Sequence, residues 1–144
     1  MSTAVAQRAP SLARRLASSL YELLILSAVL LIATFPFLAI VGDATMGWRR
    51  HLLQAYVLFV AGAYLVRFWT HGGQTLAMKT WRIRLVRDDG GTVSLGRAIH
   101  RYLLAVLGTA AAGLGFLWAL VDRDRQFLHD RLAGTALVSA ETAP

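Results

Sequence analysis

Three long apolar stretches divide the chain. Residues 16–41 are apolar almost throughout, and residues 52–69 form a second stretch interrupted by Gln54 and Arg67. Residues 103–121 form a third stretch that is also long enough for one crossing, because a membrane helix needs about 20 apolar residues. The pattern predicts an all-α helical membrane protein whose first two stretches are full transmembrane helices.

Glycines interrupt the middle of the third stretch, at Gly108, Gly113 and Gly115. A continuous helix could use these small residues to pack closely on a neighbouring helix and span the membrane. Alternatively, the glycines could break the helix into a shallow re-entrant hairpin that returns to the same side, which is tolerable only where the loop is buried in protein. The side on which the C-terminus lies depends on which reading holds.

A short β element is predicted beside the membrane helices. Over residues 81–87, apolar side chains alternate with arginines, with the period of two that is typical of a half-buried strand. Residues 133–139 have the composition of a second short strand, and we expect the two segments to pair. Pairing requires both strands on one side of the membrane, so it favours the re-entrant form of the third stretch.

Positive charge is concentrated in the loop 70–101. The whole chain has 15 Lys and Arg against 8 Asp and Glu, a formal net charge of +7. Because basic loops stay on the cytoplasmic side, we expect this loop, the β element and the N-terminus to be cytoplasmic. The loop should also attract anionic lipid headgroups. Clustering of basic residues between apolar stretches argues against a nucleic-acid partner.

Several kinds of chemistry have no support in the sequence. The chain has no Cys, and its four His residues are far apart, so we expect neither a metal site nor a bound cofactor. No nucleophile elbow, catalytic triad or phosphate-binding loop is present. We therefore expect no enzymatic activity and no catalytic residues.

Ionisable side chains in or near the membrane stretches are the best candidates for function, because burying each of them in a membrane is costly. Arg14 opens the first stretch and Glu22 lies about two turns further along it. Asp130 and Arg131 follow the third stretch. These four residues are the candidate functional charges.

Six motifs together resemble the RDD family of small bacterial membrane proteins, over residues 14–138. The motifs are RRLA at 14–17, GQTLAMK at 73–79, IRLV at 83–86, SLGRA at 94–98, LGFLWAL at 114–120 and LHDRLAGT at 128–135. The resemblance implies a multi-pass protein of the bacterial inner membrane. It divides the chain into a flexible tail (1–12), an RDD-like membrane domain (13–139) and a short C-terminal tail (140–144).

The family is named for one Arg and two Asp residues. The resemblance assigns the Arg to Arg14 and the later Asp to Asp130. The first-helix Asp has no counterpart, because its position falls on Tyr21, with Glu22 beside it. Glu22 could replace it only from an adjacent face, about 100° round the helix.

Two functions follow from the resemblance and the charges. In the first, an oligomer lines a polar path with Arg14, Glu22 and Asp130 and couples protons to the transport of an ion or small solute. In the second, the chain is a non-transporting accessory or scaffold protein that docks onto a larger membrane complex through its small-residue helix faces.

Overall fold

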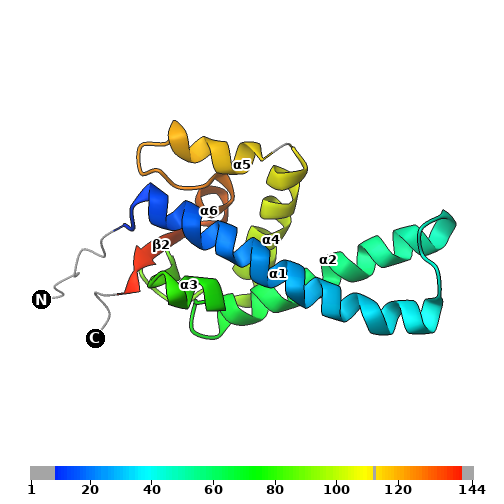
Figure 1. Ribbon diagram of the computed structural model, residues 1–144. Helices are drawn as coiled ribbons and strands as arrows, with labels where there is room; N and C mark the ends of the chain where they lie inside the picture. The colour runs from blue at the N-terminus through cyan, green and yellow to red at the C-terminus, as the bar shows by residue number, and fades with distance from the viewer. Residues whose placement is uncertain (1–8, 112, 141–144) are drawn as a thin grey trace, which may run out of the picture.

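Two long helices form a hairpin that projects from a smaller unit of short elements in the computed structural model, which describes residues 9–111 and 113–140 (Figure 1). α1 spans Leu12–Val41 and α2 spans Gly47–Thr70. Both are long and apolar enough to cross a membrane. The protein is therefore mostly helical with two candidate membrane spans.

Both helices begin earlier than the apolar stretches 16–41 and 52–69 that predict them. α1 starts at Leu12 because the Ser11 hydroxyl accepts the backbone N–H of Arg14 at 3.3 Å and caps the first turn. The tail expected over residues 1–12 therefore ends one residue earlier, before Leu12. Residues 1–8 of this tail and residues 141–144 lie outside the described residues. The first turns of both helices contain arginines, so the apolar pattern does not show where the helices begin.

Few specific contacts hold the outer part of the hairpin together. The Tyr56 hydroxyl donates to the Ala33 carbonyl at 2.9 Å, and the Tyr56 ring lies 4.9 Å from that of Phe37. Many large apolar side chains of the two helices are exposed, including Leu24, Ile32 and Phe59. Exposed apolar surface of this extent fits helices that are surrounded by lipid.

The compact unit contains the remaining elements. They are α3 (Leu76–Thr80), β1 (Ile83–Arg87), α4 (Leu95–Ala110), α5 (Leu114–Leu117), the 3₁₀ helix η1 (Trp118–Leu120), α6 (Leu128–Ala133) and β2 (Thr135–Ser139). β1 and β2 pair antiparallel, with Ile83 opposite Ser139 and Arg87 opposite Thr135. Alternation along the strands buries Ile83, Leu85 and Leu137 in the core.

The third apolar stretch is not one straight helix. α4 begins at Leu95, well before the predicted start of the stretch at 103, because the Ser94 hydroxyl caps it. The chain then bends by 103° between α4 and the α5–η1 segment. Gly113 has a φ of +76°, a conformation that is easy only for glycine.

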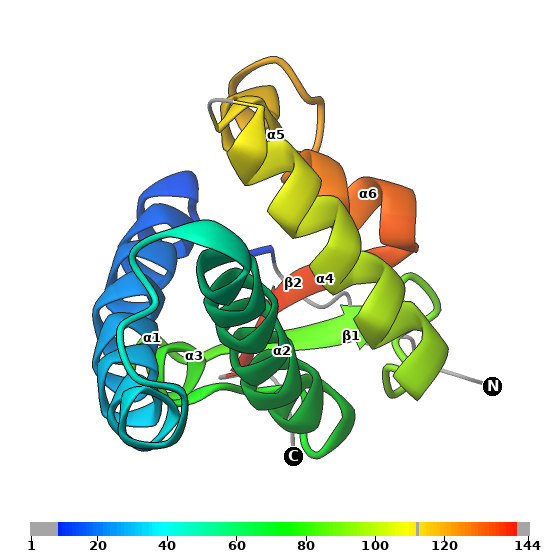
Figure 2. The ribbon, with the colours of Figure 1, turned by 90° about the vertical axis from the view of Figure 1, so that its right-hand side faces the viewer.

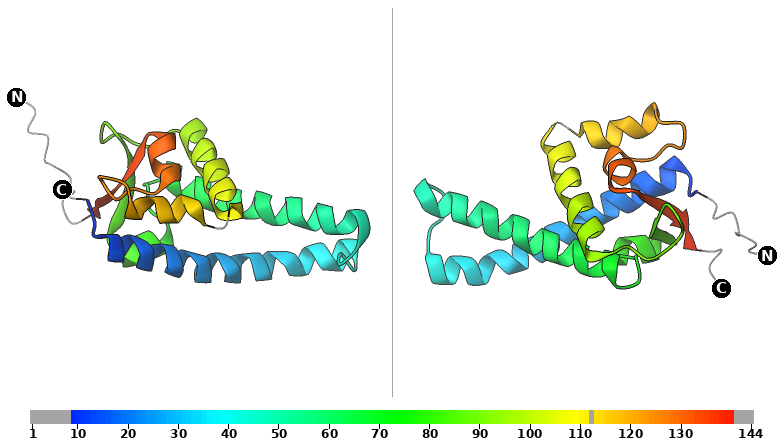
Figure 3. Two further views of the ribbon diagram at one scale, coloured as in Figure 1. Left: turned by 90° about the horizontal axis from the view of Figure 1, so that it is seen from above. Right: turned by 180° about the vertical axis from the view of Figure 1, so that it is seen from behind.

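The core lies where the base of the hairpin meets the sheet and the short helices. Figure 2 looks onto the turn of the hairpin, with the β1–β2 sheet behind it and α4 to α6 to one side. The start of α1 and the end of β2 lie at this compact end, and the hairpin extends away from it (Figure 3). The core is built from Trp69, Met78, Ile83, Leu85, Val93, Ala98, Ala119, Phe127 and Leu137.

Candidate functional site

A cavity of about 120 Å³ lies at the base of the hairpin, where α1, α2, α4 and α6 converge. Its polar lining consists of Arg15, Ser18, Ser19 and Glu22 of α1, Trp69 of α2, Arg101 of α4 and His129 of α6. Leu65, Met78, Phe116 and Phe127 are among the apolar residues that complete its wall. The wall is mostly apolar, but the polar groups lie on one cavity that has room for several water molecules.

One face of α1 supplies the polar side chains on that side of the cavity. Arg15, Ser18 and Glu22 are three and four residues apart, a spacing that places them on one helical face. Tyr21 is 42% exposed and faces away. Arg14 and Tyr21, the positions that the family resemblance selects, do not line the cavity. Arg15 and Glu22, which are also seven residues apart, both line it.

The Glu22 carboxylate is only half satisfied. The Thr75 hydroxyl donates to its Oε2, while Thr75 also caps α3 by accepting the Met78 N–H at 3.2 Å. Oε1 is buried and makes no hydrogen bond among the described residues, and the Tyr64 hydroxyl, which is also buried and without a hydrogen bond, lies near the carboxylate. Sequence reasoning identified Glu22 but not Thr75, which lies 53 positions away in the chain.

Asp130 forms a buried ion pair with Arg101. The Arg101 Nε donates to Asp130 Oδ1 at 2.6 Å, and the two side chains are only 5% and 2% exposed. The guanidinium also lies 4.1 Å from the centre of the Trp69 ring, a favourable cation–π contact. Arg101 was not among the predicted functional residues. The sequence did contain a signal for it, because Arg101 lies three positions after Ala98 and therefore on the same inner face of α4.

His129 is held between aromatic rings beside this pair. Its ring stacks on Phe127 with centroids 5.5 Å apart, and its Nε2 is 3.8 Å from Asp130 Oδ1. Burial lowers the pKa of His129 to about 4, and the charge of Arg101 acts in the same direction while that of Asp130 opposes it. The imidazole is therefore neutral at pH 7, and its buried Nδ1 has no partner among the described residues.

Arg14 and Arg15 bind backbone carbonyls. Arg14 donates to the Trp81 carbonyl at 2.6 Å and to that of Arg82 at 3.3 Å, and Arg15 donates to the Arg125 carbonyl. Arg82 and Arg125 are the non-glycine residues with positive φ in the described chain, each at 52°. The two arginines therefore stabilise two turns in a backbone conformation that is unfavourable for non-glycine residues. Arg14 does not line the cavity.

Arg131, one of the predicted functional charges, does not line the cavity. Its side chain is 45% exposed and pairs with Asp122, and with Asp124 at 3.8 Å. The pKa of Asp122 lies below its usual range because the Gln126 backbone N–H donates to it and Arg131 is nearby. These contacts stabilise the loop before α6 without reaching the cavity.

The described residues contain no group of three His, Cys, Asp or Glu side chains placed to hold a metal ion. The cavity instead brings together one carboxylate with an unpartnered oxygen, one neutral imidazole and two guanidinium groups. Such a set can bind and release a proton.

Comparison with known proteins gives a family match. The sequence profile of the RDD family matches residues 9–134. The chain is 29% identical over 90 residues to the Uncharacterized protein RP437 of Rickettsia prowazekii (strain Madrid E), an alignment that covers 62% of this chain and 50% of that protein. The chain thus spans about half the length of the curated relative that it matches. No solved structure matches the chain significantly.

Proposed function

The chain belongs to the RDD family, and from this and the cavity we propose that it is a subunit for ion- or proton-coupled transport in the bacterial inner membrane, acting as an oligomer. Glu22 is the group that exchanges a proton or a cation. The proposal involves no enzymatic step and no cofactor.

The unpartnered Oε1 of Glu22 is the observation that carries this proposal. A carboxylate in a membrane helix is costly unless it is paired or hydrated, and such residues often mark ion or proton pathways. Thr75 fixes one oxygen and leaves the other at the cavity. Arg15 and Arg101 line the same cavity.

An oligomer is part of the proposal because a single chain has few membrane helices. Two candidate spans and one bent pair adjoin a partly open space of about 120 Å³, which is too small to be a continuous path across a bilayer. A second copy would complete the path. In the proposed arrangement the N-terminus is cytoplasmic, and the α4–α5 segment re-enters on that side.

Glu22→Gln tests the proposed function directly. In proteoliposomes with an imposed Na⁺ or K⁺ gradient, a pH dye inside the vesicles should report proton movement for the native chain and none above empty vesicles for Glu22→Gln. Glu22→Asp should retain part of the flux, because it keeps the carboxylate. Tyr21→Phe is the matched control on the outward face and should behave as the native chain does. Undiminished flux through Glu22→Gln would refute the proposal.

A non-transporting accessory role is the second candidate, and the Arg101–Asp130 pair favours it. A fully satisfied buried pair that joins α4 to α6 is what a structural lock requires. Asp130→Asn should then destabilise the protein by about 3–5 kcal/mol, because it leaves Arg101 buried and unpaired. Thermal unfolding in detergent measures this effect. Under this role the native chain drives no flux in proteoliposomes and co-purifies with a partner protein in mild detergent.

A further inference from the structure

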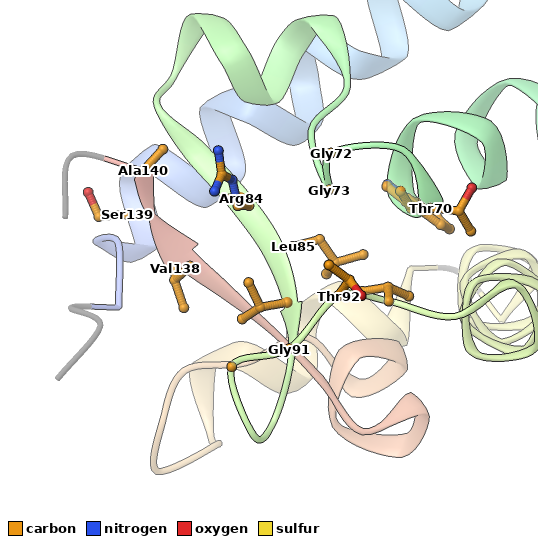
Figure 4. Close-up of a pocket in the computed structure, with 14 residues that line it drawn as sticks. Thr70, Gly72, Gly73, Arg84, Leu85, Gly91, Thr92, Val138, Ser139 and Ala140 are labelled. Carbon is orange, nitrogen blue, oxygen red and sulfur yellow. The ribbon is translucent and has the colours of Figure 1, made fainter. Parts of the chain in front are cut away.

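A second pocket, separate from the Glu22 cavity, lies on the opposite face of the β1–β2 sheet (Figure 4). Its volume is about 230 Å³. Val86 and Val138 of the two strands line the pocket, together with the glycine-containing segments 72–73 and 90–91. Trp69 is the single residue that lines both this pocket and the Glu22 cavity. We refer to it as the sheet pocket.

Arg84 gives the sheet pocket a positive charge that the protein does not balance. It is the one ionisable residue among those that line the pocket, and no carboxylate accompanies it there. Within the described residues, the Arg84 side chain makes no hydrogen bond or ion pair, and its Nε is buried without a partner. Arg87 on the same strand is different, because Asp89 binds it at 2.6 Å. An uncompensated guanidinium in a concave site calls for an anion.

Further donors lie along the pocket walls. Among the described residues, no acceptor takes the backbone N–H of Gly72, Gly73 or Thr92. Gly72 and Gly73 have φ values of +95° and +69°, so they leave the backbone uncovered by side chains at this wall. Backbone N–H groups and an arginine are the donors that typically bind phosphate oxygens in proteins.

The depth of the sheet pocket in the protein also points to phosphate. α2 ends at Thr70, which lines the pocket together with Trp69. α2 is a candidate membrane span, so the pocket lies at one end of a span, and the polar headgroup region begins where a span ends.

We propose that the sheet pocket binds a phosphate group through the guanidinium of Arg84 and the backbone N–H groups of its glycine-containing walls. The phosphate belongs either to an anionic lipid headgroup or to a soluble phosphate compound. The site is independent of the proposed transport function, so Glu22→Gln should leave phosphate binding unchanged.

Two binding measurements on the purified full-length chain test this proposal. The first titrates inorganic phosphate into protein in a neutral detergent by calorimetry, with chloride used to hold the ionic strength constant. The second compares binding of a fluorescent phosphatidylglycerol to the chain in phosphatidylcholine nanodiscs. We expect Arg84→Gln to weaken binding about tenfold or more in whichever arm shows it, as the loss of a charge-assisted hydrogen bond predicts. Arg84→Lys should lose part of the affinity, because it keeps the charge but not the planar fork.

Arg123→Gln is the matched control, since Arg123 is exposed and lies outside the pocket. Binding of inorganic phosphate in the first measurement would show that the pocket takes a soluble phosphate compound. Binding of phosphatidylglycerol in the second measurement alone would show that it takes a lipid headgroup. Equal losses for Arg84→Gln and Arg123→Gln would overturn the proposal, because they would show only general attraction to a basic surface. Absence of binding in both arms, with native thermal unfolding, would overturn it as well.

Discussion

Charged side chains at the base of the hairpin are buried only where a specific neighbour compensates them. Arg15 binds backbone carbonyls, and Arg101 has both the Asp130 carboxylate and the face of the Trp69 ring. Glu22 differs, because one of its oxygens is unpartnered within the described chain. A buried polar atom without a partner costs about 1–3 kcal/mol, so its retention is better explained by function than by stability.

His129 should make the stability of the protein depend on pH. Its folded pKa of about 4 lies below its ordinary value of 6.5, so only the unfolded chain takes up a proton between these values. Stability is therefore complete above pH 6.5 and falls as the pH drops towards 4. The loss from this residue approaches about 3 kcal/mol at pH 4.

Thermal unfolding in detergent at pH 7 and pH 4.5 measures this effect. His129→Gln should reduce the difference between the two pH values, because glutamine does not titrate. The exposed His100 provides the control, and His100→Gln should keep the native difference. An unchanged difference in His129→Gln would show that the imidazole does not remain neutral in the folded protein.

Among the elements, α4 and the segment after it are joined by an unusually close approach of two glycines. A Cβ placed on Gly108 would lie 3.3 Å from the Cα of Gly115. This contact lets the chain return after the 103° bend and brings Phe116 to the cavity wall. Any larger side chain at Gly108 would separate the two segments.

Gly108→Leu should therefore destabilise the protein by about 1–3 kcal/mol, as overpacking does in other close contacts. Gly96 lies in the same helix and has nothing within 4 Å of its Cβ position. Gly96→Leu should be neutral or slightly stabilising, because leucine is the better helix former. The comparison is made by thermal unfolding of both variants in one detergent. Equal effects of the two substitutions would contradict the role of the glycine contact.

For the whole molecule, the paired strands require that the segments before and after the bent helix pair lie together. β1 precedes α4 and β2 follows α6, and they pair over five residues on each strand. A full crossing between them would place the strands on opposite sides of the bilayer. The paired sheet therefore supports a re-entrant α4–α5 segment.

Cysteine labelling in intact cells can test this topology without competing thiols, since the native chain has no Cys. An introduced Thr45→Cys lies in the turn of the hairpin, and a membrane-impermeant maleimide added outside should label it. Arg123→Cys follows the bent pair and should be protected until the cells are opened. Labelling of both positions from outside would instead establish three full crossings.

The sequence alone determined the membrane character, the two long helices and the family, and the family is confirmed. These features are local, because an apolar stretch of sufficient length is stable in a bilayer whatever the rest of the chain does. The sequence also predicted Glu22 and Asp130 as candidate functional charges. Each is a carboxylate in or near a membrane stretch, and its burial cost can be judged without a structure.

Only the tertiary structure decided which partners these charges have. Arg101 pairs with Asp130 across 29 positions, and Thr75 reaches Glu22 across 53. The choice of Arg15 over Arg14 as the arginine at the cavity likewise depends on how α1 is rotated against the other helices. Such contacts arise when distant segments fold together, so spacing along the chain carries no record of them.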